Sequence, residues 1–216
     1  MGSCCGTKAP KSNNRFQETK FLFSDLHTVD MDLYNVLPSV CKIRVNEWVG
    51  SGFFIKLKEI NYLMTNEHVI TRKAIDNKNN ILIYYNCEKE NLIINLNKCQ
   101  RHIQEFRNIN LDITIVEILP KDRVDDYLFL EPEINEPLYL RNKKIYIPQF
   151  PGGKKLSHSE GTIDSINGYE FSYTASTMKG SSGSPILLKN SIKVIGIHKE
   201  GDKFKLSRNY GNLIYK

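Results

Sequence analysis

The sequence predicts an all-β fold divided into two halves. From about residue 36 onward, short segments alternate between apolar and polar residues, with Gly, Pro and Asn between them. Many short strands at this spacing are typical of β-sandwiches and β-barrels. The charged stretch 120–136 is the best candidate for a connection between two such units. We therefore divide the chain into a disordered tail (1–25), a first β unit (36–120), a linker (121–136) and a second β unit (137–216).

The strands follow from a two-residue period. Cys41, Ile43 and Val45 alternate with Lys42 and Arg44, which is the pattern of a half-buried strand. Further strands are predicted at 52–57, 62–65, 81–85, 92–96 and 113–118, and in the second half at 137–140, 144–150, 161–166, 169–175, 184–188, 193–198, 203–206 and 213–215. Turn residues at 151–153 and 167–168 separate several of them. Helical patterns are confined to 66–72 and 100–108.

The composition indicates an ordinary globular protein. The 216 residues are 40% hydrophobic and include 30 Lys and Arg against 24 Asp and Glu, a net charge of +6. Half of that charge lies in residues 1–20, where four basic residues accompany one Glu. Because the rest of the chain is nearly balanced, the charge gives no reason to expect a nucleic-acid partner.

The five cysteines indicate a reducing compartment. Their number is odd, Cys4 and Cys5 are adjacent, and no pair has metal-ligand spacing. Cys41, Cys87 and Cys99 lie in apolar or strand-like segments, so we expect reduced core thiols. Neither a secretory signal nor an apolar run of about 20 residues is visible, and we expect an intracellular protein.

The first five residues carry signals for lipid attachment. Removal of Met1 exposes Gly2 for myristoylation, and Cys4 and Cys5 can then be palmitoylated. Two acyl chains, or one chain with basic residues, anchor a protein stably to a membrane. Position 6 is Gly rather than the Ser or Thr of the myristoylation motif, and Thr7 comes one place later. The alternatives are an acylated tail at the cytoplasmic face of a membrane and an unmodified tail in the cytoplasm.

One candidate for each part of a serine-based catalytic site occurs in the chain. His68 follows an apolar strand, Asp112 precedes an alternating one, and Ser182 lies in the run KGSSGSP. A serine hydroxyl needs a base in contact with it and a group that orients the base. Each residue alone has an ordinary structural explanation, as a hydrogen-bonding His, a turn Asp and a loop Ser. Their joint occurrence in this order predicts a catalytic triad.

The glycines around Ser182 suit the charge that forms in such a reaction. An attacked carbonyl becomes an oxyanion, on which two backbone N–H groups must converge. Gly180 can adopt a backbone conformation that directs its N–H to the same point as that of Ser182. Gly180 and Ser182 are therefore the predicted oxyanion-hole donors, and Gly183 leaves room behind the nucleophile.

Together these motifs resemble the chymotrypsin-fold serine proteases, and most closely the bacterial glutamyl endopeptidases and related intracellular trypsin-like enzymes. The resemblance covers about residues 38–215 and depends on several separated motifs in the family's order. They are GSGFF at 50–54, TNEHV at 65–69, LDITIV at 111–116, FPGG at 150–153, GTI at 161–163, GSSGSP at 180–185 and VIGIH at 194–198.

The resemblance implies two antiparallel six-stranded β-barrels with the active site between them. It places His68 and Asp112 in the first barrel and Ser182 in the second. Ser182 is then the acylated nucleophile, His68 the general base and later acid, and Asp112 the orienting group. The strand at 196–199 is expected to pair with the substrate backbone as an added edge strand. The implied activity is that of a serine endopeptidase acting on proteins or peptides.

Three features depart from the digestive members of this family. Ser181 replaces the aspartate that captures a newly cleaved N-terminus, so we expect an enzyme that is competent without zymogen cleavage. Ser176, six residues before the nucleophile, places no acid at the base of the specificity pocket. The chain ends shortly after the strand at 213–215, so the family's C-terminal helix is expected to be absent.

The resemblance also implies a substrate preference. Thr177 and His198 coincide with positions that hold the substrate carboxylate in the glutamyl endopeptidases. A His donor and a hydroxyl donor can bind the side-chain oxygens of Glu or Gln, and a protonated His favours Glu. The predicted preference is Glu or Gln before the scissile bond. The alternative is that His198 only packs or hydrogen-bonds within the barrel.

Two other functions are alternatives to the serine endopeptidase. A catalytically inactive protein-binding module on the same fold is the main alternative, and the intact triad and Gly180 argue against it. A viral-type cysteine protease is disfavoured because position 182 is Ser and no Cys lies near it. No metal-ligand cluster or phosphate-binding loop is visible in the sequence, so we expect no metal and no cofactor.

Overall fold

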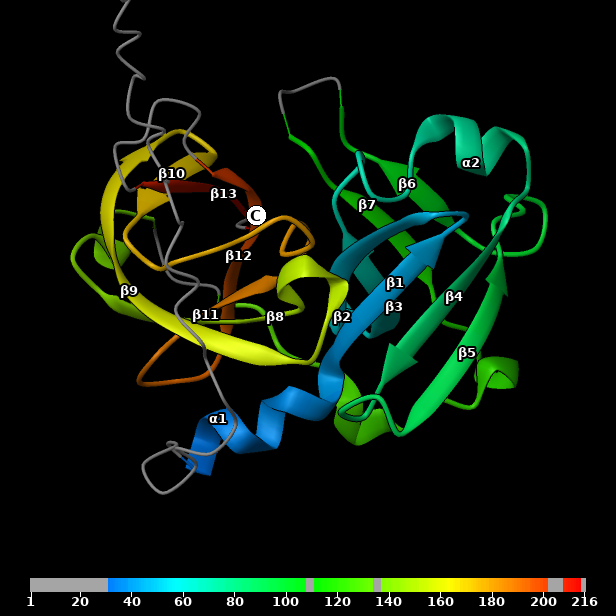
Figure 1. The fold of residues 1–216 in the computed structure, drawn as a ribbon, viewed down its shortest axis with the longest axis horizontal. Coiled ribbons are helices and arrows are strands. Elements are labelled where there is room, and N and C mark those ends of the chain that lie inside the picture. The colour runs from blue at the N-terminus through cyan, green and yellow to red at the C-terminus, as the bar shows by residue number, and fades with distance from the viewer. Residues whose placement is uncertain (1–30, 108–110, 134–136, 202–207, 215–216) are drawn as a thin grey trace, which may run out of the picture.

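The computed structural model describes residues 31–107, 111–133, 137–201 and 208–214. In these ranges two short α-helices, α1 (Met31–Val36) and α2 (Arg72–Asp76), accompany thirteen strands. The strands form two antiparallel sheets that lie side by side, the first coloured blue to green and the second yellow to red (Figure 1). The predicted all-β class is confirmed. The tail with Gly2, Cys4 and Cys5 and the strand predicted at 203–206 lie outside the described residues.

The first sheet is formed by seven strands in the order β5-β4-β1-β2-β3-β7-β6. They are β1 (Val40–Val45), β2 (Trp48–Leu57), β3 (Ile60–Thr65), β4 (Asn80–Tyr85), β5 (Glu90–Asn95), β6 (Ile103–Glu105) and β7 (Thr114–Glu117). Each pairs with its neighbour antiparallel, as in Phe53 opposite Met64. In the described residues the edge strands β5 and β6 are not paired with each other. The sheet is therefore curved but open, rather than the closed six-stranded barrel that the resemblance implied.

The second sheet is a closed barrel of six strands in the order β10-β13-β12-β11-β8-β9, as the resemblance implied. The strands are β8 (Lys144–Gln149), β9 (Ser157–Asn167), β10 (Glu170–Tyr173), β11 (Pro185–Leu188), β12 (Val194–Gly201) and β13 (Asn209–Leu213). Tyr173, Phe171 and Ile186 fill the interior and are at most 1% exposed. Gly161 permits a close approach within the barrel, because a Cβ there would lie 2.3 Å from the backbone nitrogen of Ala175.

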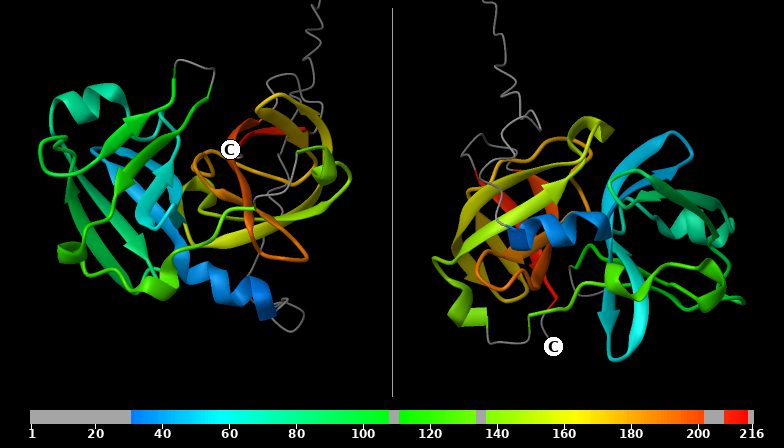
Figure 2. Two further views of the ribbon diagram at one scale, coloured as in Figure 1. Left: turned by 180° about the vertical axis from the view of Figure 1, so that it is seen from behind. Right: turned by 90° about the horizontal axis from the view of Figure 1, so that it is seen from below.

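Apolar side chains from both sheets form a shared core. Phe53 and Met64 of the first sheet pack in one cluster with Tyr146 and Ile197 of the second, and Leu33 of α1 joins them. Figure 2 shows α1 next to both sheets. This core holds the two sheets against each other and places the ends of β3 and β7 next to the loop before β11.

The segment 130–133, in the predicted linker, is hydrogen-bonded to both sheets. Leu130 N–H donates to the carbonyl of Phe54, and Lys56 N–H donates to the carbonyl of Leu130. Three residues later, Glu133 N–H donates to the carbonyl of Val194 in β12. The connection is therefore an ordered strip that joins β2 to β12.

The structure corrects several expected elements. The predicted helix at 100–108 is wrong, because Ile103–Glu105 pairs with β7 as strand β6. The predicted strand at 137–140 is a 3₁₀ turn, η5 (Pro137–Leu140). The helix expected at 66–72 begins only at Arg72, because the side chain of Thr71 accepts a hydrogen bond from Ala74 N–H and caps it. The remaining 3₁₀ turns are η2 (Leu37–Ser39), η3 (Pro120–Asp122), η4 (Asp126–Leu128) and η6 (Pro151–Gly153).

The three cysteines in the described residues are free thiols. Cys41 is buried in the first sheet, as expected, and Cys87 is half-buried. Cys99 is exposed, so its assignment to the core is wrong, because it lies in a turn before β6 and not in a strand. Within the described residues no helix is both long and apolar enough to span a membrane.

Candidate active site

His68 and Asp112 lie together at one end of the first sheet. His68 follows the end of β3, and Asp112 precedes β7, the strand that pairs with β3. The Nδ1 atom of His68 lies 2.5 Å from Oδ2 of Asp112, and the backbone N–H of His68 donates to Oδ1 at 3.1 Å. The carboxylate thus holds the ring and its backbone at once, and leaves Nε2 as the free ring nitrogen.

The charge of Asp112 suits this contact. Partial burial works to raise the pKa of its carboxyl group, but the hydrogen bonds and charge of His68 outweigh burial and lower the pKa. Asp112 is therefore ionised at neutral pH and can stabilise a positively charged imidazole.

Two buried asparagines hold the backbone of Asp112. Asn66 Nδ2 donates to the carbonyl of Asp112 at 2.6 Å, and Asp112 N–H donates to Oδ1 of Asn212 at 3.3 Å. Asn66 belongs to the TNEHV motif, whereas Asn212 comes from β13 of the second barrel. No local sequence pattern points to Asn212, because its partner Asp112 is 100 residues away in the chain.

Ser182 lies in the loop between β10 and β11. Its Oγ donates a hydrogen bond to the carbonyl of Lys199 at 3.4 Å, and the structure gives no hydrogen bond between Ser182 and His68. Catalytic hydrogen bonds are often long or unaligned before substrate binds, and rotation about one side-chain bond moves Oγ without moving the backbone.

Other contacts bring the Ser182 loop to the His68 end of the first sheet. Ser51 N–H, from β2, donates to the carbonyl of Ser182 at 2.8 Å. Gly183 packs directly against Thr65, because a Cβ on Gly183 would lie 2.4 Å from Oγ1 of Thr65. Thr65 is the last residue of β3 and precedes His68 by three residues. The structure thus gathers all three predicted triad residues at the junction between the sheets.

The amides of Gly180 and Ser182, the predicted oxyanion-hole donors, have no hydrogen-bond acceptor in the part of the chain that the structure describes. The carbonyls before them are both occupied: Lys179 O accepts from Gly152 N–H at 2.6 Å, and Ser181 O accepts from Ser184 N–H at 3.0 Å. Gly180 has φ +92°, a conformation that favours glycine, as expected.

The strand expected to bind substrate is β12, which is paired on both sides for part of its length. It pairs with β11 through Ile197 and with β13 as far as Gly201. Beyond His198, whose N–H donates to Ser184 O, no β11 residue faces β12. Among the residues that the structure describes, no strand pairs with residues 199–201 on the side of Ser182, where an added strand is expected to bind.

The two predicted specificity residues are both engaged within the second barrel. Thr177 is partly exposed, and its Oγ1 donates to Oδ1 of Asn209 at 2.8 Å. His198 is 2% exposed, and its Nδ1 lies 2.5 Å from the hydroxyl of Tyr173. Burial lowers the pKa of His198 to about 4, the nearby His68 adds to the lowering, and a hydrogen bond to the backbone of Tyr210 opposes it.

Tyr173 is a partner of His198 that sequence reasoning missed. Burial raises the pKa of its hydroxyl well above the usual value, so the group stays protonated. In the described residues its hydrogen-bond partner is His198 Nδ1, and an unsatisfied buried hydroxyl is costly. The Tyr173 hydroxyl therefore donates to Nδ1, which leaves the proton of the neutral ring on Nε2.

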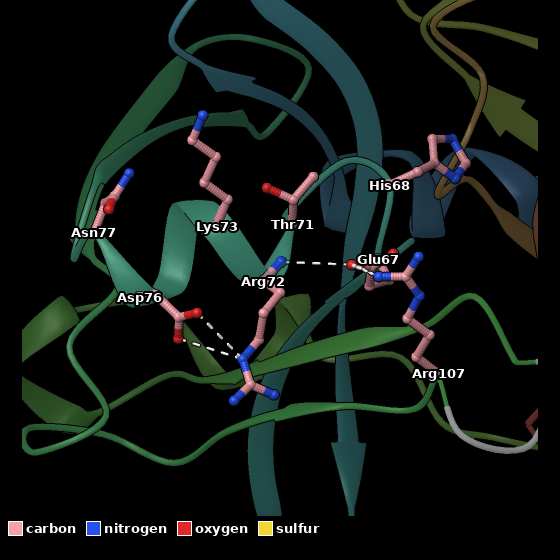
Figure 3. Close-up of a pocket in the computed structure, with 8 residues that line it drawn as sticks. All are labelled: Glu67, His68, Thr71, Arg72, Lys73, Asp76, Asn77 and Arg107. Atoms are coloured by element: carbon pink, nitrogen blue, oxygen red, sulfur yellow. Dashed lines mark hydrogen bonds and ion pairs between the residues drawn. The ribbon is translucent and has the colours of Figure 1, made fainter.

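A hollow of about 620 Å³ adjoins His68 on the side of α2 (Figure 3). Charged residues of both signs line it, and several are paired, as in Arg72 with Asp76 and Arg107 with Glu67. Among the residues that the structure describes, no group of three or more His, Cys, Asp or Glu could hold a metal ion.

Comparison with known proteins identifies a peptidase that is similar to this chain in sequence. The chain is 29% identical over 172 residues to a glutamyl endopeptidase from Staphylococcus epidermidis, a match that covers 77% of this chain and 57% of that protein. The chain thus spans a little over half the length of the curated relative.

Solved structures show the same fold. The active form of the Rv3671c protease from M. tuberculosis matches with a TM-score of 0.63 and 17% identity, over 85% of this chain and 79% of that chain. A serine endoprotease from Yersinia pestis matches with a TM-score of 0.63 and 15% identity, over 84% of this chain and 61% of that chain. Residues 50–197, more than half of the sequence, match the trypsin-like peptidase domain. The chain belongs to the trypsin-like peptidase family.

Proposed function

We propose that the protein is a serine endopeptidase that hydrolyses peptide bonds through an acyl-enzyme on Ser182. The observation that carries the proposal is the pairing of His68 with an ionised Asp112 beside a loop whose Gly180 and Ser182 amides are free. A base, an orienting carboxylate and two oxyanion donors are the groups that a serine hydroxyl needs to attack a carbonyl.

The reaction proceeds in two halves. His68 Nε2 accepts the proton of Ser182 Oγ as that oxygen attacks the substrate carbonyl, and the oxyanion accepts hydrogen bonds from Gly180 and Ser182 N–H. The imidazolium, stabilised by Asp112, then donates the proton to the departing amine. Water attacks the acyl-enzyme by the same steps, and Ser182 is released.

Covalent labelling tests this proposal against an inactive binding module. A fluorophosphonate probe is expected to label the wild-type protein, and Ser182→Ala is expected to lose the label. Ser184→Ala is a matched control, because Ser184 lies two residues away in the same loop and its hydroxyl is buried. A folded wild-type protein that takes up no label would support the binding module instead.

We further propose that the enzyme cleaves after Gln and Glu, with Gln favoured at neutral pH. His198 Nε2–H can donate a hydrogen bond to a substrate oxygen in place of its hydrogen bond to the backbone of Tyr210. The lowered pKa of His198 keeps its ring neutral at neutral pH, so the ring cannot form an ion pair with a Glu carboxylate. Burial of the unpaired carboxylate is costly, and the uncharged amide of Gln is therefore favoured. The curated relative named glutamyl endopeptidase supports recognition of a side-chain oxygen of this class.

Peptides that differ only in Gln, Glu or Ala before the scissile bond test this preference. The ratio of kcat/KM for Glu over Gln is expected to rise as pH falls from 8 to 5, because His198 takes up a proton when a Glu carboxylate binds beside it.

Tyr173→Phe removes the hydroxyl that keeps the proton of His198 on Nε2. It is expected to lower kcat/KM for Gln and Glu by about tenfold, the value of one hydrogen bond. Cleavage after Ala should not change. Preferred cleavage after Lys, Arg or large aromatic residues would contradict the assignment.

We propose that the enzyme needs no proteolytic activation. Ser181 is buried, its Oγ accepts a hydrogen bond from Met178 N–H, and its own N–H donates to the carbonyl of Met178. These local bonds support the loop without a salt bridge to a new N-terminus. The full-length protein should therefore be active as translated, and activity that arises only after N-terminal trimming would contradict this.

We also propose that the N-terminal tail is acylated at Gly2 and at Cys4 or Cys5, which would place the enzyme at the cytoplasmic face of a membrane. The support is the sequence MGSCC with the basic residues that follow it. Mass spectrometry of the protein expressed in a eukaryotic cell tests it. A free Gly2 amine with unmodified cysteines would favour the unanchored cytoplasmic protein.

A further inference from the structure

Ser51 of β2 is a buried residue to which the catalytic scheme above gives no role. It is 0% exposed, and both of its backbone polar groups are engaged outside the strand pairing: its N–H donates to Ser182 O, and its carbonyl accepts from Thr65 Oγ1 at 2.7 Å. Its side chain makes two more hydrogen bonds. Oγ donates to the carbonyl of Gly180 at 2.8 Å and accepts from Phe150 N–H at 3.2 Å.

These bonds join three segments that are distant in sequence. Ser51 lies in the first sheet, Gly180 in the loop of the nucleophile, and Phe150 immediately before the turn η6, which belongs to the second barrel. The side chain of Ser51 therefore fixes where η6 sits relative to Gly180.

The position of η6 determines the direction of the Gly180 amide. In a trans peptide the N–H points opposite to the carbonyl of the preceding residue. The carbonyl of Lys179 accepts from Gly152 N–H in η6, so Gly180 N–H must point away from η6, where it donates to no described residue. If η6 moved away, the Lys179–Gly180 peptide would lose the bond that sets its orientation.

The contacts around Gly180 leave little freedom for this peptide as long as η6 is in place. A Cβ on Gly180 would lie 2.8 Å from both Gly153 N and Phe150 O. The backbone of η6 is thus packed directly against Gly180. Gly152 itself has φ +66°, which lets the turn present its N–H to Lys179.

We propose that Ser51 is a positioning residue for the oxyanion hole: by holding Gly180 and Phe150 together, it keeps the Lys179–Gly180 peptide turned so that Gly180 N–H faces the substrate. This inference rests on the proposed serine-protease function. Ser51 touches neither the substrate nor the reacting atoms with its side chain, and it acts through Gly180.

Ser51→Ala is the direct test, because it removes both side-chain bonds and leaves the backbone bond to Ser182. Complete loss of one oxyanion donor lowers kcat by about 10²- to 10³-fold. Since the Gly152 bond remains, we expect a partial effect, a fall in kcat of about 10- to 100-fold with KM changed less than about threefold. The affinity for a peptide aldehyde, whose adduct carries the oxyanion, should fall by the same factor as kcat/KM.

Two further variants separate positioning from stability. Ser51→Cys keeps a weak donor of similar size and is expected to fall between wild type and Ser51→Ala. Ser172→Ala removes a second buried serine, whose Oγ bonds Ser165 and Asp164 on β9, outside the site. It should lower the melting temperature to a similar extent and leave kcat unchanged. Equal kcat losses in Ser51→Ala and Ser172→Ala, or kcat within about threefold of wild type in Ser51→Ala, would overturn the proposal.

A crystal structure of Ser51→Ala decides the question even if the wild-type protein proves inactive. Absence of fluorophosphonate labelling in wild type would reject the proposed function, and not this positioning role. Displacement of η6, or a Lys179 carbonyl no longer bonded to Gly152, would support the inference. An unchanged Lys179–Gly180 peptide would reject it while leaving the protease assignment intact.

Discussion

Asp112 shows how one side chain sets the state of another. Its two oxygens bind the ring and the backbone of His68, so the imidazole is held in one orientation with Nδ1 protonated. The order His, Asp, Ser and the local motifs predicted that His68 and Asp112 would meet, and the structure pairs them. The contacts that support them were not predictable, because Asn212, Tyr173 and Ser51 meet their partners only through the tertiary fold.

At the residue scale, Asp112→Asn is expected to lower kcat by about 10⁴-fold while the protein stays folded, because the amide favours the wrong tautomer of His68. Single-turnover hydrolysis of a peptide ester measures the effect. Asp126→Asn makes the same change of charge on the exposed turn η4 and should keep full activity. Activity of Asp112→Asn within tenfold of wild type would show that Asp112 does not orient the base.

At the scale of elements, the regular strands were predictable and the short irregular ones were not. The two-residue period located β1 and β4 to within about two residues, because buried positions alternate with more exposed ones in both strands. Strands β3 and β8 are buried along most of their length, and their predicted ranges also agree with the structure to within about two residues. The three-residue strand β6 gives too short a pattern for that signal. Its segment is held by Arg101, which donates to the carbonyl of Glu117 and forms two bonds with Asp122.

The Arg101–Asp122 pair leads to a prediction about stability. The two side chains are only 5% and 7% exposed, so Arg101→Met leaves a buried carboxylate without its partner. We expect a loss of about 3 kcal/mol in the free energy of unfolding, measured by urea denaturation. The double variant with Asp122→Asn should recover part of it.

The pair of Arg72 with Asp76 serves as the exposed control. Its side chains are 64% and 59% exposed, so Arg72→Met should cost less than about 1 kcal/mol. Equal losses at the two sites would mean that burial does not determine the contribution of the Arg101 pair.

At the scale of the whole molecule, the sequence predicted two β units but not how they are joined. The shared core and the strip 130–133 depend on residues from both units, and no local pattern shows which apolar faces meet. The closed second barrel came from the resemblance, as did a closed first barrel that the structure shows as an open seven-stranded sheet.

Burial of His198 in the second barrel makes the stability of the fold depend on pH. The pKa of His198 is about 4 in the folded protein, below its ordinary value of 6.5, so the unfolded chain takes up the proton first as pH falls. Protonation of His198 in the unfolded chain therefore lowers the free energy of unfolding as pH falls from 6.5 to 4, by about 3 kcal/mol in total. Above pH 6.5 the ring is neutral in both states, and this loss is absent.

Urea midpoints between pH 7 and pH 4.5 measure this loss. His198→Gln keeps a side chain that can hydrogen-bond to Tyr173 but cannot titrate, so its midpoint should fall much less over the same range. A variant with the same pH dependence as wild type would show that other groups cause the acid sensitivity.

The bonds from Ser51 to the second barrel also bear on the order in which the chain is synthesised. His68, Asp112 and Ser51 leave the ribosome well before Ser182, which follows Asp112 by 70 residues. A nascent chain that holds the base but lacks Gly180 and Ser182 has nothing to acylate and no pocket for the charge. By the proposed mechanism, proteolysis therefore cannot begin before Ser182 has been synthesised and has folded against the first sheet.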